Sequence, residues 1–261
     1  DRQRAAGETP TAGSVEREYR RLIAQREVEE NLARLRRAGS RVEYLSCDVR
    51  DAEAFRAVID DIYLRHGRID GVIHGAGIIE DKLIRDKQLD SFERVVSTKA
   101  HSAFSLAAAL RPESLRFVTF FSSVSGRFGN RGQADYAAAS EVLNKLAQEL
   151  DGRWAAHVTS INWGPWLKTG MVSEGVQRQF AERGVEVIPL SVGCDRLIEE
   201  LRFGRKGEVE VVVGGSRQPL GEGDSHDAIT LPASDQPSGG QKLTRAALPL
   251  LSIKSDLTSL A

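Results

Sequence analysis

The sequence predicts an α/β protein with a doubly wound parallel sheet. After residue 40, short β-forming runs alternate with amphipathic helical segments, an order typical of parallel sheets covered by helices. The stretch 117–145 shows this pattern most fully, because the β-forming run FVTFFSS leads through a glycine-containing loop into an alanine-rich helix. The chain has 261 residues, enough for one such domain with a substantial core.

The first elements lie in a highly charged region. Apolar residues recur at nearly helical spacing over 14–37, which predicts one long amphipathic helix or two joined ones, closed near Gly39. The run RVEYLSCDV at 41–49 predicts a strand. Residues 1–13 are polar and contain glycine and proline, so we expect a flexible end there.

The next helix has clear boundary signals. Asp51 is a favourable N-cap and Gly67 a favourable stop, so we expect a helix between them. A short buried strand at 71–74 and a tight glycine turn at 75–77 follow. We expect His74, at the end of that strand, to be a hydrogen-bonded core residue.

The second half of the chain repeats strand and helix. We expect a charged loop or short helix at 78–88, helices at about 89–110, 134–151 and 191–203, and strands at 117–122, 157–163 and 208–213. Residues 166–190, which follow a Gly-Pro turn, look like a lid-type segment with a short helix.

The composition of the C-terminal part predicts the domain boundaries. We expect the sheet domain over 14–214 and a linker rich in Gly, Ser, Pro and Asp over 215–242. The apolar run ALPLLSI within 243–261 indicates the start of a neighbouring domain or a disordered tail. Because the chain begins with Asp1 and contains one methionine, it looks like a piece of a longer protein.

The overall composition excludes several classes of function. The formal net charge of −1, with both signs interspersed, gives no footprint for nucleic acid or an acidic membrane. Cys47 and Cys194 form no disulfide or zinc-binding pattern, and no apolar run is long enough for a membrane helix. We therefore expect a reducing, cytoplasmic setting, without metal.

Two hydroxyl-bearing residues are the first candidates for chemistry. Ser123 is expected at the carboxyl end of a strand and Tyr136 at the start of the next helix, where ligands bind in open α/β sheets. A hydroxyl and a phenol at that edge can polarise a carbonyl and give it a proton. Alone, Tyr136 would more often be a half-buried residue at a helix start.

Several motifs, in order, resemble the ketoreductase domain of modular polyketide and polyunsaturated fatty acid synthases, a branch of the short-chain dehydrogenase/reductases with a Rossmann-like fold. The motifs are CDVRD, HGAG, STK, FFSS, GxxGQADYAAA and INWGPW, and the resemblance covers roughly residues 15–214. It implies NADPH-dependent reduction of a β-ketoacyl group held on an acyl carrier protein, beside neighbouring synthase domains.

The resemblance also implies roles for individual residues. Tyr136 matches the proton donor, Ser123 the hydrogen-bond donor to the substrate carbonyl, and Lys99 the charge that tunes the tyrosine and holds the nicotinamide ribose. The cofactor contacts carried over are Asp48 and Val49 at the adenine, Gly75, Ala76 and Gly77 beneath the adenosine, Gly164 and Pro165 beside the nicotinamide, and Lys99 and Tyr136. From the residues alone, Asp48 fits a turn as well as an adenine contact.

The family marks product stereochemistry at two places. A tryptophan eight residues before the tyrosine accompanies one class, and here Phe128 stands there. A Leu-Asp-Asp motif marks the other class, and Ile79, Glu80 and Asp81 are chemically close to it. The resemblance therefore leans to the second class, with a D-hydroxy product.

The chain departs from the family twice. Ser140 stands four residues after the tyrosine, where the branch usually has Asn, so we expect a weaker proton relay or one through water; Asn144 is a poor substitute. The family's first two strands, with the glycine-rich phosphate loop, have no match before residue 40. We therefore expect a fragment that binds NADPH poorly by itself.

Two alternatives stay open at this point. One is a stand-alone reductase of the same superfamily that acts on a small ketone or alcohol. The other is a degenerate scaffold domain without catalysis, which Ser140 and the missing phosphate loop favour and the intact Ser123, Tyr136 and Lys99 oppose.

Overall fold

A computed structural model of the chain describes residues 11–167 and 186–214. The chain divides into two units, residues 1–46 and 47–261, and each is described by itself. The described part of the first unit contains one helix, α2, Ala12–Arg37, in agreement with the helix predicted over 14–37. Thr11 caps it, because its side chain accepts a hydrogen bond from the Ser14 N–H at 3.1 Å.

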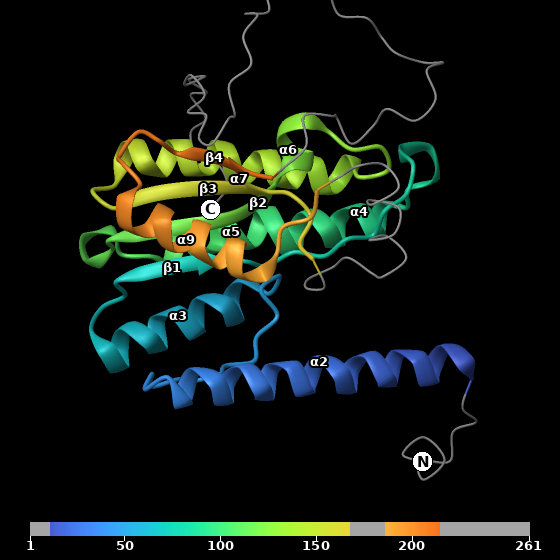
Figure 1. The fold of residues 1–261 in the computed structure, drawn as a ribbon, viewed down its shortest axis with the longest axis horizontal. Helices are drawn as coiled ribbons and strands as arrows, with labels where there is room; N and C mark the ends of the chain where they lie inside the picture. Colours follow the sequence, from blue (N-terminus) through green and yellow to red (C-terminus); the bar gives the residue numbers. More distant parts are fainter. Residues whose placement is uncertain (1–10, 168–185, 215–261) are drawn as a thin grey trace, which may run out of the picture. The chain divides into compact units, whose positions relative to one another are not determined.

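The second unit contains a parallel sheet, which confirms the predicted fold class. Its four strands pair in the order β1-β2-β3-β4, and every described pair is parallel (Figure 1). The strands are β1 Gly71–His74, β2 Phe117–Ser123, β3 His157–Trp163 and β4 Glu210–Val213. In register, Phe117 of β2 lies beside both Gly71 and His157, so these three strands begin together. β2 and β3 also end together, with Ser123 beside Trp163, whereas β1 ends beside Phe120.

The helices follow the strands as the sequence predicts. They are α3 Ala52–His66, α4 Leu89–Val96, α5 Ser102–Ala109, α6 Val124–Phe128, α7 Ala134–Arg153 and α9 Leu190–Phe203, with short turns at Ile84–Asp86, Ser97–His101 and Pro112–Ser114. The caps of α3 are those expected, since the Asp51 carboxylate accepts from the Ala54 N–H and Gly67 has a φ of 73°.

Helices cover both faces of the sheet. On one face, α3, α5 and α7 pack on the strands through a core that includes Tyr63, Leu106, Val118 and Leu143. The other face is covered by α9 (Figure 1). There Ile161 and Trp163 form a smaller cluster with Leu197 of α9. This two-sided covering leaves the carboxyl ends of β2 and β3 as the edge where side chains from several elements meet.

The structure corrects three expectations. Residues 41–49 are not a strand, because a strand persists only with a hydrogen-bonded neighbour and the four-stranded sheet does not include them. The loop expected after β2 contains the short helix α6, whose N-cap is Ser123. The helix expected over 89–110 is interrupted by a π-helical turn at Ser97–His101.

The lid-type segment predicted at 166–190 lies mostly outside the described residues. Its ends are described, and Trp166 and Ile188 form an isolated parallel bridge there. Across 11–167 and 186–214, no helix is both long and apolar enough to cross a membrane.

Candidate active site

Ser123 and Tyr136 meet at the carboxyl edge of the sheet. Ser123 ends β2, and its hydroxyl accepts a hydrogen bond from the Ser125 N–H at 3.1 Å, which caps α6 and fixes the serine rotamer. Tyr136 lies in the first turn of α7 and interacts with the Ser123 hydroxyl. The two residues therefore come together as the sequence predicts.

Lys99 completes this group from a third element. Its ammonium nitrogen lies 4.7 Å from the centroid of the Tyr136 ring and donates a hydrogen bond to the Phe121 carbonyl at 2.9 Å. The residue is only 2% exposed. A lysine at this position would ordinarily be a solvated surface charge, so its burial beside the tyrosine sets it apart.

Burial dominates the electrostatics of the pair. It raises the pKa of the Tyr136 phenol, while the interaction with Ser123 lowers it and the Asp81 carboxylate raises it further. Burial also lowers the pKa of Lys99 to about 8. At neutral pH the tyrosine is thus a proton donor, and a positive charge stands beside it to stabilise the phenolate that remains after transfer.

The structure places Ser140 away from solvent beneath α6. It is fully buried, and its hydroxyl has no hydrogen-bond partner within the described residues. A Cβ added at Gly126 would lie 2.8 Å from the Ser140 Cβ, so α6 packs directly on this position and leaves little room for a larger side chain. Asn144 is held elsewhere, because it accepts from Ser160 and donates to Asn162.

The predicted cofactor residues lie along the same edge of the sheet. Gly75, Ala76 and Gly77 follow β1, and neither glycine has a positive φ. Residues 75–77 run on without a turn, contrary to the tight-turn expectation. A Cβ added at Gly75 would meet nothing within 4 Å, so packing does not require glycine there. Gly164 and Pro165 follow β3, and the Gly164 N–H donates to the Val213 carbonyl at 2.7 Å.

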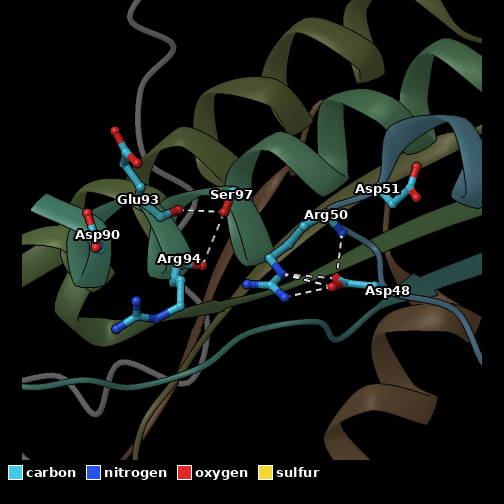
Figure 2. A pocket seen from close by; sticks show the side chains of 7 residues that line it. All are labelled: Asp48, Arg50, Asp51, Asp90, Glu93, Arg94 and Ser97. Carbon is cyan, nitrogen blue, oxygen red and sulfur yellow. Dashed lines mark hydrogen bonds and ion pairs between the residues drawn. The ribbon is translucent and has the colours of Figure 1, made fainter.

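Asp48 has the turn-forming role that was one of its two predicted readings. Its carboxylate accepts hydrogen bonds from the side chain and backbone N–H of Arg50, which lower its pKa to about 2. Val49 is half-buried beside it. Asp48 also lines an open cleft of about 510 Å³ against α4, shown in Figure 2. The other lining residues are Arg50, Asp51, Asp90, Glu93, Arg94 and Ser97.

Sequence reasoning missed a polar network in front of the tyrosine. Gln133, three residues before Tyr136, donates to the Asp81 carboxylate at 2.9 Å and accepts from the Ser125 hydroxyl at 2.7 Å. Its spacing from Tyr136, about one helical turn, was the available signal. Glu80 does not join this network in the same way as Asp81, because its carboxylate accepts two hydrogen bonds of 3.0 and 2.8 Å from Arg94.

Phe128, the residue eight positions before Tyr136, lies at the end of α6 and is 60% exposed.

A buried ion pair lies at the start of α7. Lys87 forms this pair with Asp135 and also donates a hydrogen bond to the Glu80 carbonyl. This ion pair fixes the segment that contains Glu80 and Asp81 against the start of α7, which no local sequence pattern indicated.

A family profile and sequence relatives match this chain. The profile described as the KR domain matches residues 17–168. A polyunsaturated fatty acid synthase from a Thraustochytrium species has a component that is 35% identical over 218 residues, which are 82% of this chain and 8% of that protein. Polyketide synthase GfsA of Streptomyces halstedii is 36% identical over 142 residues, 54% of this chain and 2% of that one. The chain thus spans a small part of these relatives.

Solved structures with the same fold include ketoreductases. A ketoreductase domain from the bacillaene assembly line has 31% identity and a TM-score of 0.64, covering 74% of this chain and 47% of that one. The ketoreductase from the first module of phoslactomycin biosynthesis in a Streptomyces species has 28% identity and a TM-score of 0.66, covering 71% and 43%. The chain spans less than half of each of these two structures.

Proposed function

The chain belongs to the KR domain family, and on this basis we propose that it reduces a β-ketoacyl thioester, carried by an acyl carrier protein, to the β-hydroxyacyl thioester with NADPH. The observation that carries the proposal is the convergence of Ser123, Tyr136 and a buried Lys99 at the carboxyl edge of β2. These three groups supply a hydrogen-bond donor, an acid and a positive charge, which together activate a carbonyl to accept a hydride and a proton.

Each residue acts on the carbonyl oxygen or on the group that protonates it. The Ser123 hydroxyl donates a hydrogen bond to the carbonyl oxygen, which polarises the carbon. The Tyr136 phenol gives its proton to that oxygen as negative charge develops there. The Lys99 ammonium, 4.7 Å from the phenol ring, stabilises the tyrosinate that remains. When bound, a nicotinamide cofactor supplies the hydride for the carbon.

The residues at the edge of the sheet fit the nicotinamide and adenosine parts of such a cofactor. Open space surrounds the Cβ position of Gly75, so its backbone is accessible to a flat ligand. Gly164 follows β3 at the edge where Ser123 ends β2. We assign Gly75, Ala76, Gly77, Gly164 and Pro165, with Asp48 and Val49 at the adenine, as the residues that would hold it.

We further propose that the chain works beside other synthase domains in one polypeptide. The relatives named above are synthases many times longer than the matched segment. A cytoplasmic location is consistent with this role.

We also propose that the product is the D-hydroxy enantiomer. Asp81, one of the residues that resemble the motif of that class, is held near the tyrosine by a hydrogen bond from Gln133.

The test is turnover by the full native polypeptide that contains this chain. NADPH absorbance is followed with a β-ketoacyl thioester, and the product is identified as the hydroxyacyl thioester by mass spectrometry. We expect turnover with NADPH and the D-hydroxy enantiomer on a chiral column. A polypeptide that assembles normally but never reduces any β-ketoacyl thioester would instead support the scaffold alternative, which the buried Ser140 without a partner among the described residues favours.

A further inference from the structure

The helix that carries Lys99 changes its winding at the lysine itself. A π-helical turn, Ser97–His101, separates α4 from α5. At its end, the Ser102 N–H donates to the Ser97 carbonyl, five residues earlier. In a regular α-helix that N–H would serve the Thr98 carbonyl, four residues earlier. The π turn therefore leaves the Thr98 carbonyl in need of another donor.

The Ser102 side chain supplies that donor. Its hydroxyl donates to the Thr98 carbonyl at 2.6 Å. A serine hydroxyl has one hydrogen, so its lone pairs are what remain for a second bond. The Nε2 of His74 lies 2.8 Å from the same oxygen, and the network assigns the ring proton to Nε2 as donor. His74 thus holds the hydroxyl that closes the π turn.

His74 is a firm anchor for this bond. It ends β1, is only 5% exposed, and packs edge-on against the Phe120 ring at 5.8 Å between centroids. Burial, and secondarily the charge of Lys99, lower the pKa of His74 to about 4. The imidazole is therefore neutral at physiological pH, and its hydrogen bond to Ser102 links the turn to the sheet.

The winding of this turn decides where Lys99 lies. Each residue of an α-helix advances the side-chain direction by about 100°. If the π turn relaxed to regular α-helix, the segment before Ser102 would rotate by about that angle relative to α5. The Lys99 ammonium would then leave the Phe121 carbonyl and the Tyr136 ring, which it now contacts at 2.9 and 4.7 Å.

We propose that His74 and Ser102 are positioning residues for the reduction: their hydrogen bond holds the π turn that places Lys99 beside Tyr136. Neither residue touches the reacting atoms. The proposal rests on the proposed function for its kinetic consequence, while its structural part stands on the described contacts alone.

The experiment compares three single variants and one double variant of the full native polypeptide. Ser102→Ala removes only the hydroxyl, and His74→Phe keeps an aromatic ring but removes the donor. Ser105→Ala, on the same helix outside the π turn, is the matched control. The kcat and KM for a β-ketoacyl thioester and NADPH are measured with the amide hydrogen exchange of residues 97–103.

We expect Ser102→Ala and His74→Phe each to lower kcat by about tenfold to a hundredfold with the KM for the thioester nearly unchanged, because displacing a catalytic group by even about 1 Å can cost about a hundredfold. The kcat of the double variant, Ser102→Ala with His74→Phe, should be no lower than that of the more impaired single variant, since both residues act through one turn. Exchange across the turn should accelerate in both, and Ser105→Ala should match the wild type.

Other outcomes overturn the proposal or separate it from the proposed function. Unchanged kcat in both single variants, or losses that multiply in the double variant, would refute the positioning role. If the wild type shows no turnover, the proposed function fails, and hydrogen exchange alone decides whether His74 and Ser102 hold the turn. Exchange equal to wild type in both variants would then refute that link.

Discussion

Replacement of Lys99 by methionine would show how strongly the fold disfavours this charge. Burial lowers the lysine pKa from 10.5 to about 8, and a difference of that size corresponds to about 3 kcal/mol. Below pH 8 the lysine is charged in the folded and unfolded states, and the full cost of burying the charge applies. Between pH 8 and 10.5 the folded state releases its proton first, so the unfolded state binds more protons and stability rises with pH.

We therefore expect the unfolding free energy of the wild type to rise by about 3 kcal/mol relative to Lys99→Met between pH 8 and 10.5. Lys99→Arg is the matched control, because its guanidinium stays charged and it too lacks a titration in this window. Denaturant unfolding of the chain, followed by the fluorescence of its three tryptophans, measures the difference. A difference between wild type and Lys99→Met that stays constant from pH 8 to 10.5 would refute the reasoning.

Three further predictions concern packing, the buried ion pair and the cofactor. Gly126→Ala should destabilise the chain by about 1–3 kcal/mol in denaturant unfolding, because its Cβ would lie 2.8 Å from the Ser140 Cβ and 2.9 Å from the Glu141 N. Gly152→Ala, which meets nothing within 4 Å in helix α7, should be neutral or stabilising, and equal losses would contradict this account. Lys87→Met should cost about 3–5 kcal/mol, since it leaves the 2%-exposed Asp135 side chain without its cation. Lys145→Met, which breaks the more exposed ion pair with Glu141, should lower the free energy of unfolding by less than about 1 kcal/mol in denaturant unfolding. Equal losses for Lys87→Met and Lys145→Met would contradict this account. The isolated chain should bind NADPH weakly in calorimetry, because its described residues show no glycine-rich turn at a helix start to hold the pyrophosphate; a micromolar Kd would disprove this.

Local signals predicted much of the fold. Asp51 and Gly67 act within a few residues of their own helix, so both ends of α3 follow from them. The strands from β1 to β4 follow from short apolar runs with turns on either side. Residues 41–49 are also rich in β-forming residue types, but they are not a strand. Hydrogen-bonded pairing with a neighbouring strand, rather than intrinsic propensity, decides whether a strand forms.

The candidate site, like the fold, could be predicted only in part from the sequence. The meeting of Ser123 and Tyr136 follows from the order strand, loop, helix, and the resemblance supplied Lys99. The contacts that hold them join residues far apart in sequence: His74 with Ser102, and Lys87 with Asp135. No periodicity or spacing encodes such pairs. The sequence did not predict the π turn at Lys99 for a related reason. The cost of leaving regular α-helical winding there is offset by the hydrogen bond between Ser102 and His74, which lies on another element.

The most direct test of the account is the kcat of Tyr136→Phe in the full native polypeptide, with NADPH and a β-ketoacyl thioester. The control is Tyr63→Phe, which removes only a hydroxyl of a buried tyrosine outside the site, where it accepts a hydrogen bond from the Arg111 N–H at 2.9 Å. The account predicts that Tyr136→Phe loses about a hundredfold or more in kcat, the size expected of a missing general acid, while Tyr63→Phe retains it. Equal activity in both variants and the wild type would contradict the assignment of Tyr136 as the acid.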